Sequence, residues 1–191
     1  MDLPTATVNN SSGLLEDVSF RNSPNCNARP DGTEIDMVVV HGISLPAGEF
    51  GGEWIDRLFL NQLEGHEHPT FKDLEGVKVS SHLLIRRDGE IIQYVPFDKR
   101  AWHAGVSEYD GRENCNDFSI GIELEGTDDI PYESEQYTSL SAVAVALLKA
   151  YPAISEQRLV GHVDIAPGRK TDPGPVFNWQ IFREAVHSKV K

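Results

Sequence analysis

Two histidines lie where an α/β protein most often binds a ligand. His41 directly follows the apolar, β-branched run 35–40, and His162 follows the short apolar run 158–161. Both runs are typical of buried strands, and α/β sheets bind ligands at the carboxyl ends of their strands. Two neutral imidazoles and one carboxylate form a common catalytic zinc site, which leaves a fourth position open for water. Either histidine alone is more often structural than catalytic, but two at equivalent strand ends are better evidence for a site, and a metal site is one that they could form.

The carboxylate of such a site would come from the loop that follows the second histidine. Asp164 and Asp172 are both near in the sequence, and their spacing alone does not decide between them. Asp172 precedes Pro173, which favours an extended and rigid backbone at the aspartate. Lys170, two residues earlier, would lie on the same side of an extended segment, where it could stabilise a developing oxyanion or simply be solvated.

A second acidic candidate lies on the segment 118–125, which alternates like a strand. One face of this strand is apolar, and the opposite face carries Glu123 and Glu125 beside Gly121. Either glutamate could act as a general acid or base near a metal-bound water, and the period of two does not rank them. Both could also be solvated.

The other histidines give weaker signals. His66 and His68 fall in a polar, proline-flanked loop and are expected to be exposed. His82 lies in a predicted strand and could pack inward, whereas His103 follows Trp102 and could line a pocket or support one.

The elements that would position these residues alternate between strands and helices. Asp88-Gly89 predicts a hairpin between two β-rich runs, and Ser134 is a plausible N-cap for an amphipathic helix that ends before Pro152. We therefore expect a mixed α/β domain with one central β-sheet over residues 35–191, after a polar, loosely structured lead-in over residues 1–34. The predicted elements are strands at 35–40, 79–86, 90–95, 118–125 and 158–161, and helices at 53–60, 134–151 and 178–189.

Composition excludes several classes of function. The 191 residues carry 17 basic and 30 acidic side chains, a net charge of −13, which argues against sequence-independent binding of nucleic acid. The longest apolar run, 142–148, is far shorter than the roughly 20 residues of a membrane span. The N-terminal residues lack the features of a secretory signal, so we expect a cytoplasmic protein. Cys26 and Cys115 form no C-x-x-C pair, which argues against a disulfide scaffold or a thiolate zinc site.

Four segments together carry a family resemblance: VVVHGISLPAGEFGG, SSHLLIRRDGEIIQYVPFDKRAWHAG, NDFSIGIELEG and GHVDIAPGRKTDPGP. They resemble the zinc-dependent N-acetylmuramoyl-L-alanine amidases, in particular the cytoplasmic branch that cleaves 1,6-anhydro-muropeptides during cell-wall recycling. The resemblance runs in order from about residue 38 to about residue 182. It implies the peptidoglycan-recognition-protein-like fold, in which a mixed central sheet is flanked by helices.

The resemblance also implies roles for single residues. His41, His162 and Asp172 match the zinc ligands of the family, Glu123 matches its catalytic acid/base, and Lys170 matches the lysine that assists the reaction. The implied partner is a small muropeptide rather than nucleic acid or a membrane, and we expect a monomer. Members of this branch often have asparagine where this chain has Gly42, a change that removes a possible substrate contact and leaves the metal ligands in place.

Two alternatives share the fold. A non-catalytic peptidoglycan-binding module would typically have lost part of the zinc site, whereas this chain keeps all three proposed ligands. A wall-directed lytic amidase or endolysin would use the same chemistry on intact peptidoglycan, and the missing signal sequence argues against it.

Overall fold

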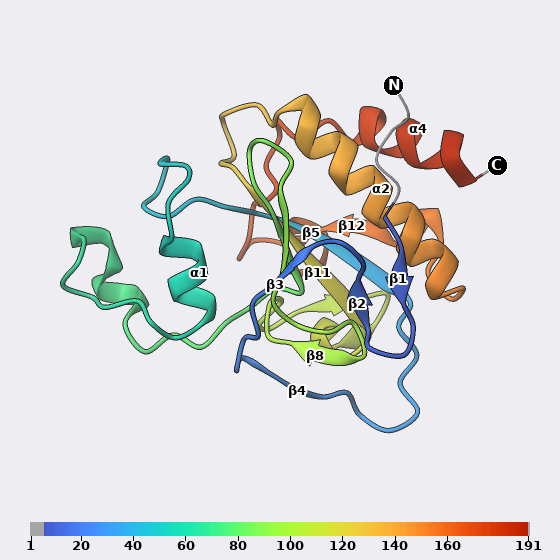
Figure 1. Cartoon of the computed structure of the whole chain (residues 1–191), viewed down its shortest axis with the longest axis horizontal. Helices are drawn as coiled ribbons and strands as arrows, with labels where there is room; N and C mark the ends of the chain where they lie inside the picture. Colours follow the sequence, from blue (N-terminus) through green and yellow to red (C-terminus); the bar gives the residue numbers. More distant parts are fainter. Residues whose placement is uncertain (1–5, 191) are drawn as a thin grey trace.

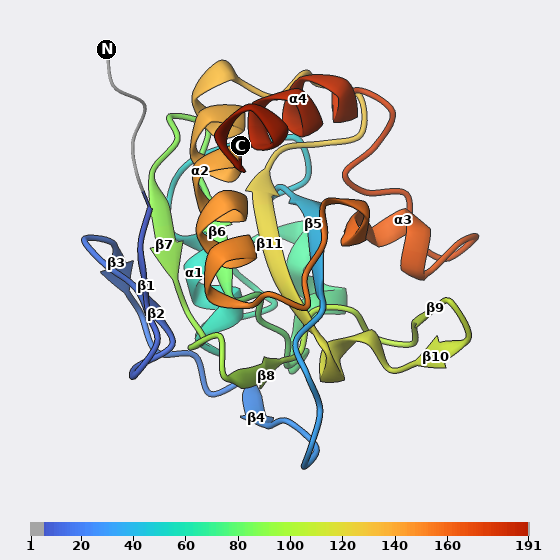
Figure 2. The same cartoon turned by 90° about the vertical axis from the view of Figure 1, so that its right-hand side faces the viewer.

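A six-stranded mixed sheet forms the centre of the computed structural model, which describes residues 6–190. The strand order is β12-β5-β11-β6-β7-β3, and all neighbours are parallel except the antiparallel pair β6 and β7. Figure 1 shows β12, β5 and β11 at the centre of the molecule, and Figure 2 shows β6 and β7 beside β11. These strands are β3 (Ser19–Phe20), β5 (Met37–Ile43), β6 (Leu83–Ile85), β7 (Ile91–Gln93), β11 (Ser119–Glu125) and β12 (Leu159–Gly161). The predicted mixed α/β fold with one central sheet is confirmed.

Two helices cover one face of this sheet. α2 (Ser134–Ala150) and α4 (Trp179–Val190) pack against each other on the same side of β11 and β5 (Figure 2). Alternate residues of the two central strands, such as Val40 and Ile122, are fully buried beneath the helices. Because strand side chains alternate, the residues between them point to the opposite face, and those include the candidate site residues.

Side-chain hydrogen bonds cap the N-termini of both helices, and the N-cap of α2 differs from the predicted one. Asn178 caps α4, because its Oδ1 accepts from the Ile181 amide at 3.1 Å. The N-cap of α2 is Glu133 rather than Ser134, and the Glu133 amide donates to Gln136 Oε1 at 3.1 Å.

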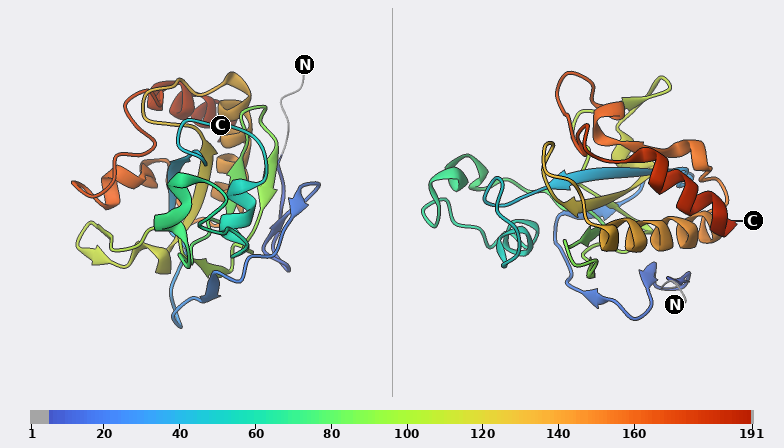
Figure 3. Two further views of the ribbon diagram at one scale, coloured as in Figure 1. Left: turned by 90° about the vertical axis from the view of Figure 1, so that its left-hand side faces the viewer. Right: turned by 90° about the horizontal axis from the view of Figure 1, so that it is seen from above.

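The remaining elements are short and surround the opposite side of the sheet. Helix α1 packs with η1 at one end of the sheet (Figure 3). The strand pairs β9 with β10 and β4 with β8 form two small ribbons, and α3 directly follows β12. The bounds are β4 (Cys26–Ala28), α1 (Trp54–Phe59), η1 (Pro69–Leu74), β8 (Lys99–Ala101), β9 (Glu108–Tyr109), β10 (Arg112–Glu113), η2 (Cys115–Asp117), η3 (Glu156–Arg158) and α3 (His162–Ile165). None of the helices in the described residues is long and apolar enough to cross a membrane.

The polar N-terminal segment is more ordered between residues 6 and 34 than its composition predicted. It forms β1 (Val8–Asn9), β2 (Leu14–Leu15), β3 and β4, and β3 joins the central sheet beside β7. Leu15 is buried, and its amide donates to Gln93 Oε1 at 2.7 Å. Residues 1–5 of the predicted lead-in lie outside the described residues, and the domain boundary at residue 35 stays a prediction.

Candidate metal centre and its acidic neighbour

The central strands place the first two candidate residues side by side. His41 on β5 is directly paired with Glu123 on β11, and both strands run in the same direction. β12 flanks β5 on its other side, with Gly161 opposite Val40. His162 is therefore delivered next to His41, at the first residue of α3. The carboxyl ends of three parallel strands thus converge on one point, as expected for a ligand site in such a sheet.

The loop after α3 completes a group of three possible metal ligands. Asp172 Oδ2 lies 3.0 Å from His162 Nδ1 and 3.4 Å from His41 Nδ1, and the two Nδ1 atoms are 2.9 Å apart. The backbone holds the loop in place, because the Val163 amide donates to the Asp172 carbonyl at 3.0 Å. These residues form a group that could hold a metal ion.

The donor atoms of this group fit a cation. His162 Nε2 faces the Ala104 carbonyl oxygen at 3.2 Å, and a carbonyl oxygen can only accept. In the neutral form of this ring the hydrogen is therefore on Nε2, and the lone pair of Nδ1 points at the Asp172 carboxylate. A lone pair and a carboxylate oxygen that face each other at 3.0 Å repel unless a positive charge lies between them. Two imidazole nitrogens and one carboxylate oxygen are a donor set typical of catalytic zinc.

The surroundings of His41 and Asp172 favour the protonation states that bind a metal ion. The pKa of His41 is lowered to about 4, mainly by burial, with a smaller contribution from the nearby His162 and against the opposing effect of the Asp172 carboxylate. Burial would raise the pKa of Asp172, but the two neighbouring imidazoles outweigh this effect and hold that pKa well below its usual range. Neutral imidazole and ionised carboxylate are the forms that bind metals.

Glu123 lies against this group with one free oxygen. Its Oε1 is 4.0 Å from His41 Nδ1, and its Oε2 is buried without a hydrogen-bond partner in the described structure. Burial raises the pKa of Glu123 well above its usual value, Asp172 adds to the increase, and Lys170 opposes it. A carboxyl group with a raised pKa and one buried, unpaired oxygen is a candidate for proton transfer. Lys170 is exposed in the same loop as Asp172.

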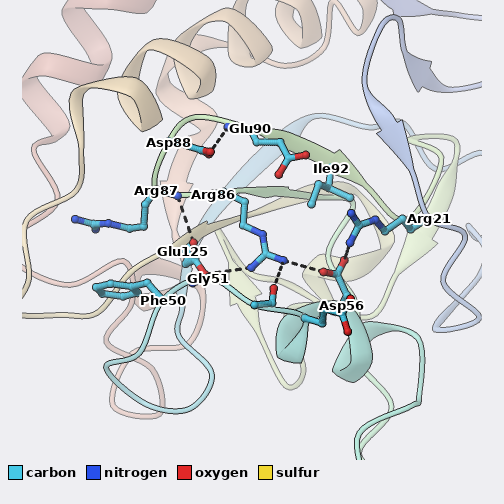
Figure 4. Close-up of a pocket in the computed structure, with 12 residues that line it drawn as sticks. Arg21, Phe50, Gly51, Asp56, Arg86, Arg87, Asp88, Glu90, Ile92 and Glu125 are labelled. Carbon is cyan, nitrogen blue, oxygen red and sulfur yellow. Dashed lines mark hydrogen bonds and ion pairs between the residues drawn. The ribbon is translucent and has the colours of Figure 1, made fainter.

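Glu125 is different, although it shares the face of the strand with Glu123. Its Oε1 accepts from Arg86 Nη1 at 3.1 Å and from the Gly51 amide at 2.6 Å, and its Oε2 accepts from the Arg87 amide at 3.3 Å. Arg86 also donates to Asp56 on α1 (Figure 4). Both residues line a pocket of about 460 Å³. Both carboxylate oxygens of Glu125 thus accept hydrogen bonds from neighbouring segments, and Glu125 has a structural role.

The other sequence candidates lie outside the metal group. Asp164 accepts from the Gly161 amide at 2.7 Å at the start of α3. His66 is exposed, whereas His68 is half-buried and accepts from the Thr70 amide at the start of η1. His82 and His103 are both buried.

One residue near the site gave no signal in the sequence. Tyr132, in the loop before α2, donates from its hydroxyl to the Pro173 carbonyl at 2.9 Å, one residue after Asp172. A Cβ on Gly42 would lie 2.5 Å from that hydroxyl, and one on Gly126 would lie 2.9 Å from Cζ of the ring. The missing side chain at Gly42 therefore leaves room for the tyrosine, and the tyrosine supports the loop of Asp172.

We expect Tyr132→Phe to lower the free energy of unfolding by about 1 kcal/mol, because the buried Pro173 carbonyl loses its partner. Urea denaturation measures the change. Tyr109→Phe is the control, because the Tyr109 hydroxyl makes no hydrogen bond within residues 6–190, and its free energy of unfolding should stay within about 0.5 kcal/mol of the parent. Equal values for the two variants would contradict the assigned role of Tyr132.

Comparison with known proteins agrees with this architecture and site. Residues 31–175 match the family described as N-acetylmuramoyl-L-alanine amidase. The chain is 60% identical over 164 residues to 1,6-anhydro-N-acetylmuramyl-L-alanine amidase AmpD of Escherichia coli (strain K12). This alignment covers 86% of this chain and 89% of the relative. The crystal structure of a Se-Met AmpD derivative superposes with a TM-score of 0.89 at 57% identity, covering 92% of this chain and 97% of that one.

A more distant solved structure contains a ligand. AmpDh3 from Pseudomonas aeruginosa in complex with an anhydromuramic pentapeptide has a TM-score of 0.60 at 31% identity, and the match covers 83% of this chain and 62% of that one. The fold and the site define an α/β protein with a histidine, histidine and aspartate group at the ends of its parallel strands. More specifically, the chain belongs to the N-acetylmuramoyl-L-alanine amidase family.

Proposed function

We propose that this protein hydrolyses the amide bond between the lactyl group of 1,6-anhydro-N-acetylmuramic acid and the L-alanine of the stem peptide. The observation that carries the proposal is the group of three ligand atoms beside a buried carboxylate with a free oxygen. The names of the relatives and the muropeptide complex of AmpDh3 supply the substrate class.

The metal in this proposal is Zn²⁺, held by His41, His162 and Asp172. The donor set supports zinc, and the two cysteines play no part, since Cys26 and Cys115 lie apart from the group. Bound zinc would polarise the scissile carbonyl and lower the pKa of a water molecule in its open position.

The proposed roles of the other residues follow from their positions. Glu123 accepts the proton of the attacking water on its free Oε2 and later delivers it to the leaving amine of L-alanine. Lys170 places its ammonium group near the developing oxyanion of the amide. Burial of Glu123 supports this role, because a raised pKa brings a carboxyl group closer to the pH at which it must both accept and release a proton.

The setting in the cell belongs to the same proposal. We place the reaction in cytoplasmic recycling of peptidoglycan, carried out by a monomer whose catalytic domain spans residues 35–191. A small soluble muropeptide is its partner, and neither nucleic acid nor a membrane takes part. The net charge of −13 supports the exclusion of nucleic acid.

Metal analysis combined with mass spectrometry of the products tests the proposal. The purified protein should contain about one zinc ion per chain and should release the intact stem peptide from a defined anhydro-muropeptide. Intact sacculi should be cleaved much more slowly. Zinc-loaded protein that releases no peptide would instead support a binding module, and faster cleavage of sacculi would support a wall-directed amidase.

A further inference from the structure

A chain of hydrogen bonds lies behind His41, on the side away from the metal ligands. His41 Nε2 is 2.9 Å from His103 Nδ1, and His103 Nε2 is 3.2 Å from Ser119 Oγ. Ser119 Oγ in turn lies 2.6 Å from the Cys115 carbonyl oxygen. All three side chains are buried, so water does not compete for these contacts.

The Cys115 carbonyl oxygen determines which atom donates and which accepts in each hydrogen bond of this series. A carbonyl oxygen only accepts, so the single hydroxyl hydrogen of Ser119 points to Cys115. Ser119 Oγ must then accept from Nε2–H of His103. A neutral imidazole has a hydrogen on only one of its two ring nitrogens, so Nδ1 of His103 accepts from Nε2–H of His41. His41 is left with a lone pair on Nδ1, the atom that faces Asp172 and His162.

His103 is held in place from both its backbone and its ring. Asn116 Oδ1 accepts from the His103 amide at 3.1 Å and from the Ala104 amide at 2.8 Å. The ring lies over Gly121, where an added Cβ would be 2.5 Å from His103 Nδ1. The ring is buried and its two nitrogens face an imidazole and a hydroxyl, so these contacts provide no anion to stabilise a charged ring.

We propose that His103 and Ser119 are positioning residues that hold His41 in the tautomer with hydrogen on Nε2, so that Nδ1 is free to bind a metal ion. The inference rests on the proposed function only in taking His41 as a metal ligand. Histidine ligands commonly donate the N–H of the ring nitrogen that does not bind the metal to a carboxylate or a carbonyl. Here a second imidazole and a serine hydroxyl connect the ligand to the carbonyl.

Long-range ¹H–¹⁵N spectra of the histidine rings test the tautomers directly in the wild-type protein. We expect both His41 and His103 to carry hydrogen on Nε2, in the zinc-free and in the zinc-loaded protein. A hydrogen on Nδ1 of His41 or of His103 in the zinc-free protein would overturn the proposal. This measurement needs no variant and no substrate.

Zinc affinity, measured by competition with a chromophoric chelator, tests the consequence. His103→Ala should weaken zinc binding by about 10–100-fold, and Ser119→Ala should weaken it in the same direction. Ser141→Ala is the matched control, because Ser141 is also fully buried and its hydroxyl also donates to the carbonyl four residues earlier, but on α2, over the other face of the sheet. Its zinc affinity should equal that of the parent.

Parental zinc affinity in both His103→Ala and Ser119→Ala would overturn the positioning role. Failure of the proposed function gives a different result. A zinc-loaded protein that shows the expected ring tautomers but hydrolyses no anhydro-muropeptide would remove the proposed activity and leave the role of His103 in place.

Discussion

Glu123→Gln is expected to lower kcat for hydrolysis of an anhydro-muropeptide by about 10²–10⁴-fold while zinc remains bound. Glutamine has the shape of glutamate but cannot accept the proton of the attacking water. The substitution removes no hydrogen bond of Oε2, which has no partner in the described structure, and it removes a negative charge close to Asp172. Stability and zinc content should therefore not fall, and the loss should appear in kcat. Single-turnover kinetics with a defined anhydro-muropeptide, followed by mass spectrometry, measures it.

Glu125→Gln is the matched control, two residues away on the same face of β11. Its carboxylate is paired with Arg86 and with backbone amides, so the change should lower stability and leave kcat of the folded enzyme within a few-fold of the parent. Wild-type kcat in zinc-loaded Glu123→Gln would remove the acid/base role. An equal loss of kcat in both folded variants would show that the effect is not specific to Glu123.

The position of the site could be predicted from the sequence, because strand ends are local features. His41 and His162 each follow an apolar run, and the structure places those runs on neighbouring parallel strands. The third member of the group could not be chosen from spacing. Asp164 lies within α3 and accepts from the Gly161 amide, whereas the loop after α3 turns back and brings Asp172 to the histidines.

The two glutamates show the same limit for residues on a single strand. A period of two places Glu123 and Glu125 on one face, and nothing in β11 distinguishes them. The difference comes from Arg86, the residue directly after β6, which pairs with Glu125 and leaves Oε2 of Glu123 without a partner in the described structure. Contacts between distant parts of the sequence therefore decide which carboxylate can do chemistry, and here the family resemblance had already favoured Glu123.

The long elements of the fold were predicted, as were the short elements α1 and β12, but the strands of only two residues were not. Strands β5 and β11 and helix α2 have enough residues for their periods to show. Strands of two residues, such as β9 and β10, are too short for an alternation of apolar and polar residues to show in the sequence. The segment before residue 35 is polar in composition, yet the pairing of β3 with β7 and the burial of Leu15 order it through tertiary contacts.

Arg86→Met is expected to lower the free energy of unfolding by about 3–5 kcal/mol, because it leaves two buried carboxylates without their shared cation. Arg86 Nη1 donates to Glu125 at 3.1 Å and Nη2 donates to Asp56 at 2.7 Å, and all three side chains are at most 10% exposed (Figure 4). Asp56 keeps a second partner, Arg21, but that side chain is 41% exposed and screened by water. Chemical denaturation at neutral pH measures the loss.

The neighbouring residue offers the control for this prediction. Arg87 pairs with Glu133, whose side chain is 52% exposed, so Arg87→Met should cost at most about 1 kcal/mol. Combining Arg86→Met with Glu125→Leu should recover part of the loss, because the pair is then replaced by apolar groups instead of being broken. Equal costs for Arg86→Met and Arg87→Met would contradict the assignment. The Arg86 guanidinium also donates to the Gly52 carbonyl, and the Glu125 carboxylate accepts from the Gly51 amide. These hydrogen bonds fix the glycine-rich loop that follows β5, the strand of His41.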